Sequence, residues 1–170
     1  MAIRSTVVLA LGILVAQGLN AQTTTPREQV LEARAAAAGY AMTVMATLQE
    51  SLRLRCSLLP GLAGEQSQAA YQLWMDRNAA ALKLAAEQLH AMVRMVAEAH
   101  GEAAAQQFGQ DRIADTAANA ARENASLFPG GIADAQTCLA VARLAASGET
   151  DILRHPEFGP TLHRIGTDRD

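Results

Sequence analysis

The sequence is poor in aromatic residues, in lysine and in cysteine, and each shortage narrows what the protein can be. Aromatic residues make up 4% of the 170 residues, whereas 50% are hydrophobic. Much of the hydrophobic share is alanine, which buries little area, so we expect a thin core between closely packed helices. The single lysine, Lys83, and a formal net charge of −3 leave no basic patch. Binding to nucleic acids or to anionic lipids therefore has no electrostatic support.

Motifs that carry chemistry are also missing. The sequence contains no C-x-x-C-H haem attachment sequence, no glycine-rich phosphate loop and no zinc-ligand spacing. It shows no strand pattern and no long internal repeat. The balance of hydrophobic and charged residues is that of an ordinary globular domain. We therefore predict an all-α protein without a cofactor, and we favour a non-enzymatic role.

The first residues have the pattern of a secretory signal peptide. Arg4 supplies a positive charge, residues 7–16 form an uncharged apolar run, and Ala21 offers a small residue at the cleavage point. A run of about ten residues suits a signal peptide and is too short to span a bilayer. We predict a cleaved signal peptide at residues 1–21. The mature protein would be periplasmic or secreted, in a bacterium, with no stable membrane anchor.

The remainder of the chain is expected to be helical. Thr25, Pro26 and Glu28 have the arrangement of a capping box, with proline at the first helical position. Apolar residues then recur at helical spacing up to the glycine and proline breaks. The pattern predicts four helices and one short helical turn, over residues 26–59, 65–100, 102–127, 133–147 and 151–154. Leu73, Ile113 and Ala117 are assigned to inward faces.

Four helices joined by short connections predict an antiparallel up-down-up-down four-helix bundle, stapled by one disulfide. The bundle would occupy residues 22–155, and residues 156–170 would form a loosely ordered C-terminal tail. Cys56 and Cys138 are the two cysteines of the chain. In this topology the end of the first helix and the start of the fourth lie at the same end of the bundle. An oxidising compartment then favours a Cys56–Cys138 disulfide.

The most distinctive segment contains Tyr71, Trp74, Arg77 and Asn78. Tyr71, Trp74 and Asn78 share one helix face, and Arg77 lies one turn from Trp74. Tryptophan, tyrosine and arginine are frequent anchors of protein interfaces, so the segment is a candidate partner surface. The alternative interpretation places Trp74 in the core, with Arg77 stacked over it.

Metal binding is a weaker hypothesis. Copper(I) favours thioether ligands, and four of the six methionines and one of the four histidines are candidates. Methionine is also a common filler of helical cores, and the two pairs would lie roughly 15 Å apart along the helix axis. We therefore predict no metal site at these candidates: Met42, Met45, Met92, Met95 and His90.

Three functions remain open on the sequence alone. The leading hypothesis is a periplasmic protein-interaction module of the adaptor, chaperone or immunity type, which binds another exported protein or itself. The second is a helical bundle that binds a small ligand or a metal such as copper or haem. The third is an exported small helical enzyme of chorismate-mutase-like class, which would need convergent basic side chains. The candidates for that role are Arg34, Arg53, Arg77 and Lys83.

Overall fold

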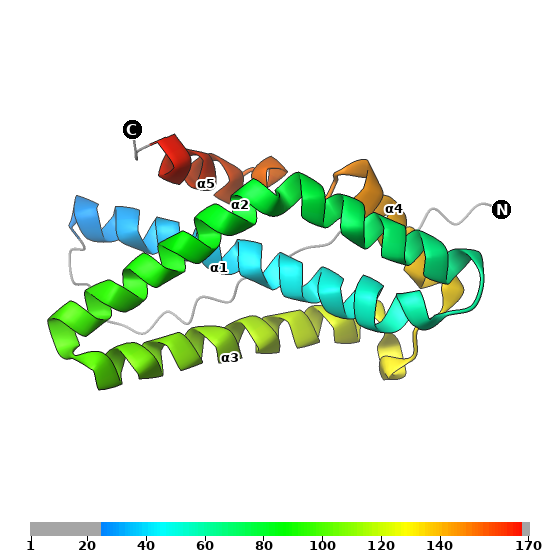
Figure 1. The fold of residues 1–170 in the computed structure, drawn as a ribbon, viewed down its shortest axis with the longest axis horizontal. Coiled ribbons are helices and arrows are strands. Elements are labelled where there is room, and N and C mark those ends of the chain that lie inside the picture. The colour runs from blue at the N-terminus through cyan, green and yellow to red at the C-terminus, as the bar shows by residue number, and fades with distance from the viewer. Residues whose placement is uncertain (1–24, 168–170) are drawn as a thin grey trace.

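A computed structural model describes residues 25–167 of the chain, and every regular element within that range is helical. Figure 1 shows the long helices running lengthwise, with the shorter ones packed on them. The predicted signal peptide lies outside the described residues. None of the described helices is both long enough and apolar enough to cross a membrane. The five α-helices are α1 (Pro26–Leu48), α2 (Leu62–His100), α3 (Glu102–Leu127), α4 (Ala135–Ser147) and α5 (Phe158–Thr167).

The first helical segment begins as the sequence predicts. The Thr25 backbone N–H donates to Glu28 Oε2 at 2.6 Å, and the Glu28 N–H donates to Thr25 Oγ1 at 3.3 Å. These two bonds complete the capping box. Beyond α1 the chain continues as a seven-residue π-helix, Gln49–Arg55, and a 3-10 turn, Cys56–Leu58. The predicted single helix up to residue 59 is therefore three consecutive helical segments of different pitch.

The long helix α2 is the element on which the others assemble, because it contacts α1, α3, α4 and α5. Its buried positions are mostly small, which lets the neighbouring helices approach closely. The predicted inward position of Leu73 is wrong, since this side chain is 46% exposed. Ile113, which is 72% exposed, and Ala117 also lie on the solvent side of α3. Fewer residues of the central part of α3 are therefore buried than its apolar pattern predicts.

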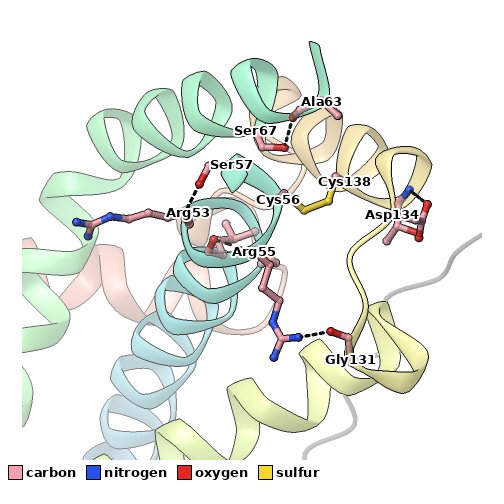
Figure 2. Close-up of a disulfide and its surroundings, with 12 residues drawn as sticks. Arg53, Arg55, Cys56, Ser57, Ala63, Ser67, Gly131, Asp134 and Cys138 are labelled. Atoms are coloured by element: carbon pink, nitrogen blue, oxygen red, sulfur yellow. Dashed lines mark hydrogen bonds between the residues drawn. A yellow bond between two sulfur atoms is a disulfide. The ribbon is translucent and has the colours of Figure 1, made fainter. Parts of the chain in front are cut away.

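The predicted disulfide is present and joins the 3-10 turn Cys56–Leu58 to α4. Cys56 and Cys138 have Cα atoms 5.5 Å apart and are fully buried. They form a small second core with Phe128. Asp134 caps α4 by accepting the Thr137 backbone N–H at 2.9 Å. Figure 2 shows the disulfide, the cap and the connection between α3 and α4 at one end of the molecule.

The C-terminal segment is the main correction to the predicted architecture. We expected a loosely ordered tail from residue 156, and the predicted bundle had four helices. Residues Phe158–Thr167 instead form α5, which packs on α1 and α2. Phe158, Leu162 and Ile165 are buried and belong to the main core. Their spacing of four and three residues gives α5 one continuous apolar face.

Candidate ligand-binding site

Of the four residues in the predicted partner surface, Trp74 and Asn78 are buried, Tyr71 is half-buried and Arg77 is exposed. Trp74 is fully buried, and its indole Nε1 donates to the carbonyl oxygen of Thr150 at 3.1 Å. Asn78 is 3% exposed. Its Nδ2 donates to Asp151 Oδ1 at 3.0 Å, and its Oδ1 accepts the backbone N–H of Ile152 at 2.8 Å. Tyr71 is half-buried against the same core. The alternative interpretation of Trp74 as a core residue is therefore confirmed.

Arg77 completes this contact by hydrogen bonding rather than by stacking on Trp74. Its guanidinium forms an ion pair with Asp151, with Nη2 and Oδ1 3.0 Å apart. It also donates from Nη1 to the carbonyl of Ala146 at 3.1 Å and from Nη2 to the carbonyl of Ala145. These carbonyls belong to the last turn of α4, where a cation is favourable. One arginine of α2 therefore holds both the end of α4 and the turn that follows it.

Gly148 shapes the start of that turn. It ends α4 with φ of 82° and ψ of 11°, a left-handed conformation that glycine adopts without steric cost. Residues 149–155 then lead from α4 to α5. We call residues 148–152 the clamped turn, because Trp74, Arg77 and Asn78 all bind it.

A cavity of about 340 Å³ lies beside the clamped turn, lined by residues of α1, α3, α4 and the segment before α5. Its volume falls within the range of small-molecule sites, roughly 300–1,000 Å³. The apolar part of its wall is large and comes from three helices. It comprises Tyr40, Val44, Leu48, Leu127, Val141 and Leu144.

The polar part of the wall is small and contains two carboxylates. Glu123 comes from α3, Glu149 and Thr150 from the clamped turn, and His155 from the segment before α5. His155 Nδ1 accepts the backbone N–H groups of Glu157 at 3.3 Å and Phe158 at 3.2 Å. Two backbone donors therefore fix the orientation of the ring beside the start of α5.

Tyr40 forms the floor of the cavity next to His155. The two ring centroids are 4.4 Å apart, and Phe158 packs 4.8 Å from each. Burial raises the pKa of Tyr40 to about 12, because the charged phenolate would lose its hydration. The phenol stays protonated at neutral pH, so Tyr40 adds no charge to the site.

Thr150 carries an unmet hydrogen bond in the cavity wall. Its Oγ1 is buried and has no hydrogen-bond partner within the described residues, while its carbonyl oxygen accepts from Trp74. Buried hydroxyl groups usually have partners, so an orphaned one needs a specific explanation.

The other sequence candidates do not converge on a site. Met42 and Met45 pack against the main core, Met92 is half-buried, and Met95 and His90 are exposed. Within residues 25–167 no group of three or more His, Cys, Asp or Glu side chains is close enough to hold a metal ion.

The basic residues considered for an enzyme site are also dispersed. Arg34 and Arg53 are 19 positions apart on continuous helical segments, a separation of roughly 25 Å or more. Arg77 is engaged by Asp151, and Lys83 is exposed on α2. The described side chains therefore form no convergent basic pocket from these candidates.

Comparison with known proteins gives no assignment, because no family model, curated protein or solved structure matches the chain. The site therefore has to be interpreted from its own residues. The cavity could not be predicted from the sequence, because its wall combines α1, α3 and α4 with a segment in which we expected only a short helical turn before the tail. The one available signal was the helical spacing of Phe158, Leu162 and Ile165, which predicts a short helix with one apolar face.

Proposed function

We propose that the protein is an exported, non-enzymatic binding protein that takes a small, largely apolar molecule into the 340 Å³ cavity. The observation that carries the proposal is the cavity itself, with an apolar wall from three helices and a few polar groups at one side. At the roughly 30 Å³ that each water occupies, this volume corresponds to about eleven waters. It suits a ligand of about ten non-hydrogen atoms.

The size of the cavity also sets the affinity to look for. Ligands of this size gain at best about 0.3–1.5 kcal/mol per non-hydrogen atom, and small apolar compounds usually fall at the low end. About ten atoms at roughly 0.4–0.5 kcal/mol each correspond to dissociation constants of about 0.1–1 mM for an unoptimised compound. A screen at millimolar ligand concentration is therefore the appropriate test.

The test is a panel of small aromatic and aliphatic compounds, screened by ligand-observed NMR. Leu144→Phe adds volume at the cavity wall, and Leu73→Phe makes the same change on the exposed face of α2 as a matched control. Compounds should bind the wild type and the Leu73→Phe variant, and Leu144→Phe should weaken them at least tenfold. Equal binding by the Leu144→Phe variant would contradict the proposal.

Export is part of the same proposal and rests on two features. Residues 1–21 have the pattern of a signal peptide. The Cys56–Cys138 disulfide is weakly consistent with an oxidising compartment, since disulfides persist there. Mass spectrometry of the protein from a periplasmic extract, without reductant, should find a chain that starts near residue 22 and lacks free thiols. An intact N-terminus, or two free thiols, would count against export.

The antiparallel up-down-up-down arrangement of α1 to α4 is likewise a proposal. Two observations support it. Only Gly101 separates α2 from α3, and the disulfide joins Cys56, just before α2, to Cys138 in α4. It places the start of α1 beside the end of α2. Spin labels at positions 32 and 98 should therefore lie close together in a pulsed dipolar measurement, whereas labels at 32 and 65 should lie far apart.

A second candidate function is protein binding at the disulfide end. Leu54, Leu58 and Leu62 are 54%, 79% and 61% exposed and lie within nine residues of one another. Exposed apolar clusters on a soluble surface are typical of interaction sites. We propose a second copy of the chain or another exported protein as the partner. Sedimentation of the wild type and a Leu58→Asp variant over a range of concentrations tests the first of these, and a monomer throughout would exclude it.

A further inference from the structure

Charge in the cavity wall is of one sign. Two carboxylates, Glu123 and Glu149, line the cavity, and its wall contains no lysine or arginine. The third ionisable side chain is His155, whose Nδ1 accepts two backbone N–H groups. Glu123 is half-buried and Glu149 is exposed. The cavity therefore presents negative charge beside an apolar wall.

The Glu123 carboxylate has no partner within the part of the chain that the structure describes. The residue is half-buried on α3, and within residues 25–167 its side chain forms no hydrogen bond and no ion pair. Glu149 is different, since its Oε1 accepts the Ser147 hydroxyl at 3.1 Å and its other oxygen has no partner among the described residues. A bound cation would give the Glu123 carboxylate the charge partner that the described residues do not supply.

The two carboxylates also differ from the other charged groups near the clamped turn. Asp151 is neutralised by Arg77, and Arg154 donates to the carbonyl of Gly148 at 3.2 Å. These charges are used to hold the turn. Glu123 and Glu149 contribute nothing comparable to the fold and come from separate elements that meet at the cavity.

We propose that the ligand of this cavity is an organic cation, an amine with an apolar body of about eight to ten non-hydrogen atoms. Its ammonium group binds between Glu123 and Glu149, and its apolar body packs on Val44, Leu48 and Val141. This inference rests on the proposed ligand-binding function and specifies the chemistry of the ligand. It also gives a role to the unpaired Glu123 carboxylate, which the fold leaves without a partner.

Three probes of one shape separate charge from size. They are phenethylamine, 2-phenylethanol and 3-phenylpropionate. All three share the phenyl ring and two-carbon spacer, and their head groups are positive, neutral and negative, respectively. Trp74 is the only tryptophan and donates to the carbonyl of Thr150 in the cavity wall, so its fluorescence serves as a reporter. Ligand-observed NMR provides an independent measurement of the same affinities.

Phenethylamine should bind about tenfold more tightly than 2-phenylethanol, and 3-phenylpropionate should bind more weakly than the alcohol. Glu123→Gln and Glu149→Gln keep the shape of the wall and remove one charge each. Each should weaken phenethylamine about three- to tenfold and leave the alcohol unchanged. Glu98→Gln, on the exposed end of α2, is the matched control and should change neither. Thermal unfolding of each variant verifies that it is folded.

The outcomes distinguish this inference from the proposed function. If the alcohol binds as tightly as the amine, or if both glutamine variants bind the amine like the wild type, the cation is wrong and the ligand-binding function stands. If 3-phenylpropionate binds best, an anion is the ligand and the inference is overturned. If none of the three binds and the wider panel also fails, the proposed function is wrong as well.

Discussion

Replacement of Arg77 by methionine tests how the clamped turn is held. The change keeps an apolar stem against α2 but removes the ion pair with Asp151 and the bonds to the carbonyls of Ala145 and Ala146. The Arg77 and Asp151 side chains are 29% and 16% exposed, so solvent screens their attraction only in part. Hydrogen bonds to charged groups contribute about 1.5–3 kcal/mol when well shielded. We expect Arg77→Met to lower the free energy of unfolding by about 2 kcal/mol, after allowance for this exposure.

The assay is urea unfolding followed by far-ultraviolet circular dichroism, with thermal melts in parallel. A loss of about 2 kcal/mol corresponds to a fall in Tm of about 4–8 °C for a domain of this size. The double-mutant cycle with Asp151→Asn should give a coupling of about 1 kcal/mol, because the two side chains bind each other directly. Arg94→Met, at an exposed position of the same helix, is the control and should stay within about 0.5 kcal/mol of the wild type. An Arg77→Met variant as stable as the control would refute the reasoning.

Three further predictions concern stability. Replacing Cys56 and Cys138 by alanine should cost about 4–5 kcal/mol in urea unfolding, since the bond closes a loop across 82 positions, and reduction of the wild type should give a similar loss. The pKa of Tyr40 is raised from 10.0 to about 12 by burial. The contribution of the protonated phenol to the free energy of unfolding is therefore complete below pH 10 and is lost as the pH rises through 12. Tyr40→Phe should therefore remove about 2 kcal/mol of the alkaline destabilisation seen in the wild type, and equal pH profiles would contradict this. Leu162→Ala, fully buried in α5, should cost about 2–5 kcal/mol, whereas Leu153→Ala, 47% exposed, should cost less than about 1 kcal/mol.

The long helices could be predicted from the sequence because local signals agree with tertiary packing there. The capping box at Thr25 and the glycine at position 101 mark helix ends that the structure retains. The disulfide could be predicted because two cysteines leave one pairing. Inward faces were predicted less well, since Leu73 and Ile113 follow the apolar period but face solvent. Alanine on the neighbouring positions makes the period ambiguous in both helices.

The fifth helix could not be predicted from propensity. It is ten residues long and contains two glycines and a proline, all of which weaken an isolated helix. It forms because Phe158, Leu162 and Ile165 are buried against α1 and α2. Gly159 lets the start of α5 lie close to the preceding segment, since a Cβ there would lie 2.2 Å from the carbonyl oxygen of Leu153. Tertiary packing thus overrides local preference in this segment.

The same reasoning predicts that the clamp and the cavity are coupled. Thr150 lines the cavity, and its carbonyl oxygen accepts a hydrogen bond from Trp74. The next residue, Asp151, forms an ion pair with Arg77. Loss of the Arg77 ion pair should therefore loosen one wall of the cavity without removing any residue from it. We expect Arg77→Met to weaken phenethylamine binding about three- to tenfold at a temperature where the variant is folded, and Arg94→Met to leave it unchanged. Binding by NMR equal to that of the wild type, together with a lowered Tm, would mean that Trp74 and Asn78 alone position the turn, and that the contribution of Arg77 is confined to stability.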